Sequence, residues 1–167
     1  MENSIRIITT GGTFDKQYNP IDGQLTFKES YLSGIISDSR CTTNIVLEGP
    51  LAIDSLFMSE EQRENVVERI LLSTEEKVIV IHGTDTMTKT AELCKLKMES
   101  DDKHIIVFTG AMVPYVLRNS DAVYNLGCAQ MGVQLLKPGV YIVMNGKAFE
   151  AGSVHKDKTV GLFIENE

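Results

Sequence analysis

Short runs of β-branched apolar residues recur along this chain, and they limit the folds open to it more than any other feature. The runs fill residues 5–8, 44–47, 78–81, 105–108 and 140–144. Between the later runs, apolar residues recur at helical spacing, as at Ala91, Cys94 and Met98. Unbroken apolar strands that alternate with amphipathic helices predict an α/β fold, a three-layer sandwich with a mostly parallel central sheet.

Two further segments carry helix signals. Ser59 and Gln62 have the S-x-x-Q form of a capping box, and Val66 and Ile70 follow at i,i+4 on the face that we expect to be buried. The other helix is marked by the apolar series Ala122, Leu126, Ala129, Val133 and Leu136. We therefore expect one helix after residue 59 and another from residue 122.

Residues 14–40 interrupt this alternation. The segment is polar and contains the turn signals Asn19-Pro20 and Asp22-Gly23. We interpret it as a long loop outside the core, of the kind that is usually functional or mobile.

Length and charge restrict the function classes. A chain of 167 residues suits one domain, because a core of that size buries roughly two-thirds of the unfolded surface. The net charge of −7, without a cluster of Lys and Arg, argues against nucleic-acid binding and favours a small-molecule ligand. The opening residues lack the pattern of a signal peptide, so a cytoplasmic protein without a membrane segment is expected. The three cysteines, Cys41, Cys94 and Cys128, have no metal-ligand spacing and are interpreted as reduced and mostly buried thiols.

Three of the predicted strands end in small polar clusters. These clusters are Thr10 to Thr13, Gly83 to Thr86, and Thr109 to Ala111. Ligands of open α/β sheets bind at the carboxyl ends of the strands, so we expect the three clusters to converge there. Hydroxyls and one carboxylate on short glycine turns suit a small polar substrate.

Other familiar chemistries lack their motifs. The turn at Thr10 to Thr13 has neither phosphate-loop spacing, and the sequence has no G-x-S-x-G elbow and no H-E-x-x-H pair. The chemistry is therefore left to Thr, Asp and Lys. A threonine hydroxyl needs a neighbouring base to become nucleophilic, and Lys156 is a candidate, although lysines are usually solvated.

Each of these residues also has a structural interpretation. Gly11 and Gly12 can simply close a tight turn, and Thr84 with Asp85 can cap a helix. His82 ends an apolar strand, which favours a buried hydrogen-bonding role over catalysis. We expect the other two histidines, His104 and His155, at the surface.

Three segments together resemble the bacterial-type L-asparaginase and glutaminase family. They are Ile8-Thr-Thr-Gly-Gly-Thr-Phe14, Ile81-His-Gly-Thr-Asp-Thr-Met87 and Thr109-Gly-Ala-Met-Val-Pro114. The resemblance spans the chain but corresponds only to the amino-terminal domain of the two-domain enzymes, which is Rossmann/flavodoxin-like. It implies that residues 1–167 form a single asparaginase-type catalytic domain.

The resemblance assigns the chemistry to four residues. It implies that Thr13 is the nucleophile, with Thr84, Asp85 and Lys156 as the proton-transfer group. In the family the second threonine is also placed to activate water, and which of the two forms the covalent bond has been argued over; we favour Thr13. A lid tyrosine is implied as well, with Tyr18 as the nearest candidate and Tyr31 as a substitute.

The resemblance also implies the substrate contacts. Ser55 aligns with the serine that binds the α-carboxylate, and Asp85 would hold the α-ammonium as well. Gly12, with Gly11, would offer backbone N–H groups to the oxyanion, and Ala111 would direct its carbonyl toward the leaving ammonia.

The implied function is hydrolysis of L-asparagine to L-aspartate and ammonia, without metal or cofactor, by a homo-oligomer, a dimer or tetramer. One alternative is a non-catalytic sensor of asparagine or aspartate, for which Asp85 and Ser55 matter and Thr13 does not. Another is an amidase acting on a larger amide, such as an aminoacyl-tRNA held by a partner.

Overall fold

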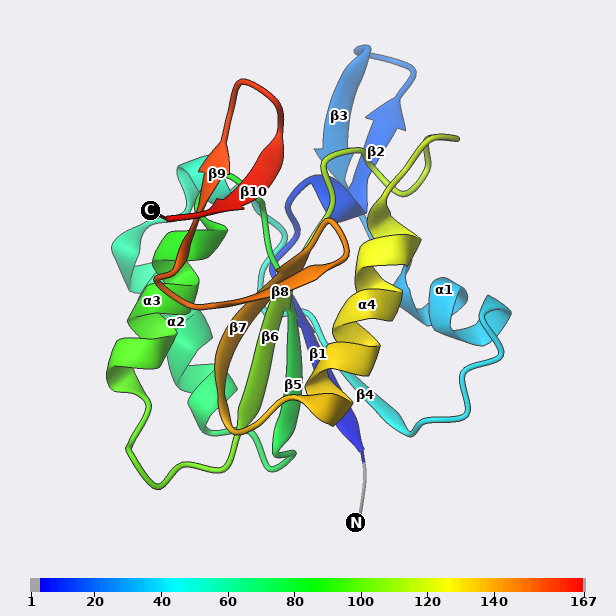
Figure 1. Ribbon diagram of the computed structural model, residues 1–167. Helices are drawn as coiled ribbons and strands as arrows, with labels where there is room; N and C mark the ends of the chain where they lie inside the picture. The colour runs from blue at the N-terminus through cyan, green and yellow to red at the C-terminus, as the bar shows by residue number, and fades with distance from the viewer. Residues whose placement is uncertain (1–3, 167) are drawn as a thin grey trace.

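A six-stranded sheet forms the centre of the computed structural model, which describes residues 4–166 (Figure 1). Its strand order is β4-β1-β5-β6-β7-β8; the first five strands are parallel and β8 is antiparallel to β7. The strands are β1 (Ile5–Thr9), β4 (Ile45–Glu48), β5 (Lys77–Ile81), β6 (Ile105–Thr109), β7 (Gly139–Met144) and β8 (Lys147–Glu150). The five strands predicted from apolar runs are confirmed.

Helices cover both faces of the sheet. The helices are α1 (Leu32–Asp38), α2 (Glu60–Leu71), α3 (Met87–Lys97) and α4 (Ala122–Leu135). Helices α2 and α3 lie on one face and α1 and α4 on the other, as Figure 1 shows. Within β5, Val78 and Val80 face the first pair, whereas Ile79 and Ile81 face the second. Both faces are therefore buried, which explains the unbroken apolar runs and confirms the three-layer α/β fold.

The sequence signal for the start of α2 is confirmed, whereas the one for the start of α3 is wrong. The capping box of α2 is present, with the Ser59 hydroxyl accepting from Gln62 N and the Gln62 side chain accepting from Ser59 N. The proposed capping role of Thr84 and Asp85 is wrong, because the residue that precedes α3 is Thr86, and its side chain makes no cap hydrogen bond. Thr84 and Asp85 instead lie in the turn between β5 and α3.

The expectation that residues 14–40 form a loop outside the core is also wrong. The segment contains the short 3-10 helix η1 (Thr13–Asp15), a hairpin of β2 (Lys16–Asn19) and β3 (Gln24–Phe27), and helix α1. Phe14, Leu32 and Ile35 are buried in the core under one face of the sheet. The turn signals were real, but they close a hairpin.

A second hairpin follows the sheet near the end of the chain. It consists of β9 (Val154–Asp157) and β10 (Leu162–Glu165), and the buried Val154 and Phe163 attach it to the core. Both hairpins stand at the end of the sheet where the parallel strands have their carboxyl ends (Figure 1). This is the end at which the polar clusters were expected to meet.

The histidines and cysteines divide by burial. His82 is buried, as expected, and His155 is exposed, whereas His104 is half-buried because its ring bonds Asp102 Oδ1 and Ser73 O. Cys94 is buried and the other two cysteines are partly exposed, all three as free thiols. Across residues 4–166, no helix is long and apolar enough to cross a membrane, and no cluster of three potential metal ligands occurs.

Candidate active site

The first and second polar turns touch through glycine. Gly12 has a φ of +68°, and a Cβ on it would lie 2.6 Å from Gly83 Cα, so a larger residue would separate the two turns. A Cβ on Gly110 would likewise collide with His82 O. The three strand-end clusters therefore converge, as the sequence predicted.

The expected oxyanion role of the first turn is not supported. Gly12 N donates to Ile53 O at 2.9 Å, and Gly11 N donates to Thr9 Oγ1 at 3.2 Å. Both N–H groups are already engaged within the protein, so they are not waiting donors. The glycines instead provide the close approach of the turns, which was the structural interpretation.

Lys156 reaches the second turn from the β9–β10 hairpin. Its ammonium donates to Thr84 Oγ1 at 2.8 Å and to Asp85 Oδ1 at 2.9 Å. The Lys156 side chain is 11% exposed and that of Asp85 is 32% exposed, while Thr84 is buried. The structure thus brings together three of the four residues that the resemblance named for catalysis.

Thr13 lies beside this group without bonding to it. It is half-buried at the first position of η1, directly after the glycine that contacts Gly83. In the described part of the chain, no hydrogen bond involves its hydroxyl. The Thr13 hydroxyl is therefore available to a ligand, but no basic side chain is hydrogen-bonded to it.

Ser55 is the most unusual polar residue near the turns. It begins the 3-10 helix η2 (Ser55–Phe57) and is 2% exposed, yet its hydroxyl is without a hydrogen-bond partner. A Cβ on Gly83 would lie 2.5 Å from that hydroxyl oxygen, so Ser55 packs directly on the second turn. Buried polar groups are nearly always paired, so the unpaired Ser55 hydroxyl is an exception beside the second turn.

An ion pair that the sequence did not reveal adjoins Ser55. Lys16 Nζ of β2 lies 2.6 Å from Asp54 Oδ2, and Asp54 Oδ1 accepts from Leu56 N. Burial raises the pKa of the Asp54 carboxyl, but the bonds from Lys16 and Leu56 and the charges of Lys16 and Lys156 together hold it below its ordinary value. The ion pair joins the β2–β3 hairpin to the segment that contains Ser55. Its two residues are 38 positions apart, so no local sequence pattern could predict it.

Ala111 lies in a loop whose backbone is firmly held. Asp121 accepts from Met112 N and Val113 N, and Asn125 Nδ2 donates to Gly110 O at 3.0 Å. Ala111 itself is buried. The third turn is therefore fixed from the start of α4, although the structure gives no direct contact between Ala111 and the Lys156 group.

Among the described residues, neither candidate lid tyrosine is hydrogen-bonded to Thr84, Asp85 or Lys156. Tyr18 is 60% exposed, and its hydroxyl is turned toward Gly23 in the tip of its own hairpin. The Tyr31 ring packs against Tyr115, with 5.3 Å between ring centroids. The placement of Tyr18 in the catalytic group is not supported, because β2 presents its side chain to solvent.

His82 has the structural role that was expected. Its Nδ1 lies 2.9 Å from Gly83 O, and its Nε2 lies 2.8 Å from Thr90 Oγ1. Burial lowers the pKa of His82 to about 4. The hydrogen bond to the Gly83 carbonyl acts in the opposite direction, and the positive charge of Arg63 lowers the pKa further. The ring is neutral near pH 7 and braces the second turn from below.

The family comparison agrees with this geometry. The family described as Asparaginase, N-terminal matches residues 4–162. Because the match covers nearly the whole chain, this protein belongs to the asparaginase family.

Particular relatives support the same assignment. L-asparaginase 1 of Escherichia coli (strain K12) is 30% identical over 132 residues, which is 75% of this chain and 38% of that protein. A glutamyl-tRNA(Gln) amidotransferase subunit of Methanococcus vannielii is 28% identical over 154 residues, covering 86% of this chain and 34% of its own. The thermostable L-asparaginase from Thermococcus kodakarensis has the same fold, with a TM-score of 0.85 at 23% identity, over 97% of this chain and 51% of the other. The chain thus spans about a third to a half of the length of these relatives.

Proposed function

We propose that this protein is an amidohydrolase that converts L-asparagine to L-aspartate and ammonia. The observation that carries the proposal is the Lys156 ammonium bonded to both Thr84 and Asp85, beside a buried and unpaired Ser55 hydroxyl. Membership of the asparaginase family supports the reaction class.

Two different side chains would bind the two charged groups of the amino-acid substrate. Asp85 would pair with the α-ammonium, and the Ser55 hydroxyl would donate to the α-carboxylate. Both ends of an amino acid would then be satisfied at the second turn. The side-chain amide would extend toward Thr13.

The reaction would proceed in two steps. Thr13 Oγ would attack the amide carbon while its proton passes to the Thr84 and Lys156 group, and the C–N bond would break as the nitrogen takes up a proton and leaves as ammonia. Water would then hydrolyse the Thr13 ester to give aspartate. Because an ammonium only donates, Lys156 would act as the neutral amine, which takes up the Thr13 proton through Thr84 and returns it to the leaving nitrogen.

Ammonia release from L-asparagine and L-glutamine tests the nucleophile. Thr13→Ala should abolish release, while Thr74→Ala, an exposed threonine at the opposite end of β5, should leave it unchanged. An active Thr13→Ala protein would assign the covalent step to another residue.

A non-catalytic sensor of asparagine or aspartate remains the second candidate, favoured by a Thr13 hydroxyl without a base and by lid tyrosines that lie elsewhere. Ammonia release from L-asparagine separates the two, and calorimetry with L-aspartate then shows whether an inert protein still binds. A sensor would not release ammonia at all, and it would keep its affinity in Thr13→Ala and lose it in Asp85→Ala.

The remaining expectations stay predictions. The amidotransferase subunit among the relatives favours a larger amide substrate. The net charge of −7 disfavours direct contact between this chain and RNA. Action without metal or cofactor, a dimer or tetramer, and a cytoplasmic location are likewise proposed.

A further inference from the structure

A buried arginine lies behind the candidate active site, and the proposed reaction does not use it. Arg63 of α2 is 3% exposed. The carboxylate paired with it is that of Glu60, which is itself 81% exposed and lies 3.4 Å from Arg63 Nε without the geometry of a hydrogen bond. A buried cation with so weakly paired a counter-charge lowers the stability of the fold, so its position calls for a role other than stability.

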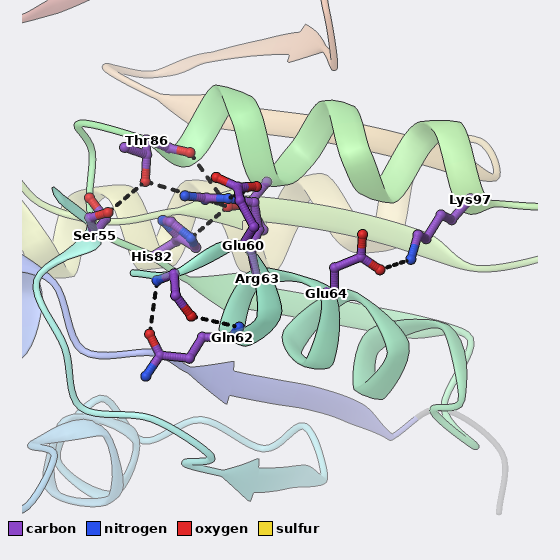
Figure 2. Close-up of polar contacts among 10 residues, drawn as sticks. Ser55, Glu60, Gln62, Arg63, Glu64, His82, Thr86 and Lys97 are labelled. Atoms are coloured by element: carbon purple, nitrogen blue, oxygen red, sulfur yellow. Dashed lines mark hydrogen bonds and ion pairs between the residues drawn. The ribbon is translucent and has the colours of Figure 1, made fainter. Parts of the chain in front are cut away.

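The Arg63 guanidinium bonds two threonines of the turn and helix that follow β5. Its Nη1 donates to Thr86 Oγ1 at 3.4 Å and makes a short hydrogen bond to Thr90 Oγ1 (Figure 2). A guanidinium has no acceptor, so both hydroxyls must accept from it. Each hydroxyl then has its own hydrogen left to donate elsewhere.

The first branch of this network ends at the substrate-binding serine. Thr86 Oγ1 donates to Ser55 O at 3.1 Å. The carbonyl of Ser55 is thereby fixed, and with it the backbone that presents the unpaired Ser55 hydroxyl. Arg63 therefore reaches Ser55 through one intervening hydroxyl.

The second branch ends at the turn that carries Thr84. His82 Nδ1 faces the Gly83 carbonyl, which only accepts, so the proton of the neutral ring sits on Nδ1. His82 Nε2 is then an acceptor 2.8 Å from the Thr90 hydroxyl, nearer than the other acceptor of that hydroxyl, Thr86 O at 3.4 Å, so we assign the Thr90 hydrogen to Nε2. The direction from Arg63 through Thr90 and His82 to Gly83 O is the same at every bond.

We propose that Arg63 is a positioning residue that orders both walls of the site, holding Ser55 through Thr86 and the Gly83–Thr84 turn through Thr90 and His82. One guanidinium sets the direction of both hydrogen-bond branches. Both donations come from the same nitrogen, Nη1, so one end of the guanidinium holds the two threonines.

The kinetic part of this inference rests on the proposed function. Loss of Arg63 lets Ser55 move, so substrate binding weakens more than the chemical step slows. Arg63→Met should raise KM for L-asparagine and Kd for L-aspartate by about tenfold, with kcat changed by less than about threefold. Arg69→Met is the matched control, because Arg69 lies on the same helix, is exposed and pairs with Glu48.

A finer pair of variants avoids the buried charge. Thr86→Val keeps the shape of the side chain but removes the hydroxyl that joins Arg63 to Ser55, so it should raise Kd for L-aspartate as Arg63→Met does. Thr86→Ser should restore the wild-type value within about twofold. The pair stays informative even if Arg63→Met fails to fold.

A measurement without substrate tests the second branch. In ¹⁵N NMR spectra near pH 7, His82 should be the neutral tautomer with its proton on Nδ1, and Arg63→Met should shift the Nε2 signal because Thr90 is no longer obliged to donate to it.

Wild-type protein that neither binds aspartate nor releases ammonia would refute the proposed function, and this spectrum would still decide the network. A proton on Nε2 overturns the network. Unchanged aspartate affinity in Arg63→Met and Thr86→Val, with only the melting temperature lowered, reduces Arg63 to a structural role.

Discussion

Replacing Gly83 by alanine tests the contact between the second turn and Ser55, the serine proposed to bind substrate. A Cβ at this position would lie 2.5 Å from Ser55 Oγ, 2.6 Å from Ser55 Cβ and 3.1 Å from Ser55 N. Real Cβ atoms do not approach heavy atoms so closely, and the obstruction includes backbone. The η2 segment must therefore shift.

The magnitude follows from the cost of overpacking a buried contact, about 1–3 kcal/mol in the free energy of unfolding. For a chain of this size that corresponds to a fall of roughly 2–12 °C in Tm. The displaced Ser55 hydroxyl should also weaken L-aspartate binding by about tenfold, as expected when one hydrogen bond to a charged group is lost.

The matched control is Gly127→Ala in α4. A Cβ there would meet nothing within 4 Å, so the change should stabilise the helix by about 0.5–1 kcal/mol. Urea denaturation compares the two variants, and calorimetry gives the aspartate affinity. If Gly83→Ala is as stable as Gly127→Ala and binds aspartate normally, the packing of Ser55 on Gly83 is not as described.

Three further predictions concern stability. Because the unfolded His82 titrates near pH 6.5 and the folded ring near 4, stability should fall by up to about 3 kcal/mol as the pH drops through that window, and His82→Gln should remove this part of the loss in urea denaturation at pH 7 and pH 4. The lowered pKa of Asp54 contributes stability above its ordinary value of 3.8 that is lost as the pH falls below it, so Lys16→Met should be less stable than wild type at pH 7, with the difference closing in acid; a constant difference would contradict the pairing. Ser59→Ala should cost about 1 kcal/mol by removing the capping box with Gln62, measured as a lower urea midpoint.

The sheet was predictable because its signals are local. The central strand β5 is buried on both faces, so Val78 to Ile81 had to be apolar at every position, and the capping box of α2 lies within four residues. Residues 14–40 gave no such signal. Their fold depends on a few buried anchors, Phe14, Leu32 and Ile35, that meet the core only in three dimensions.

The site was predictable in part for the same reason. Thr84 and Asp85 follow a buried strand, which places them at the binding edge of a parallel sheet whatever their function. Lys156 arrives from a separate hairpin, and residue types alone did not single it out; the resemblance did. Arg63 was missed because its partners lie 23 and 27 positions away, in the turn before α3 and on α3. An arginine on an amphipathic helix is by itself most simply interpreted as an exposed charge.

Ammonia release from L-asparagine by the purified protein, with Lys156→Ala and Lys158→Ala measured beside it, tests the proposed site without any assumption about the nucleophile. Lys158 is an exposed lysine just beyond β9, so it controls for charge. We expect wild type and Lys158→Ala to release ammonia at the same rate and Lys156→Ala to release none. Equal activity in all three proteins would contradict the central role given to Lys156, Thr84 and Asp85.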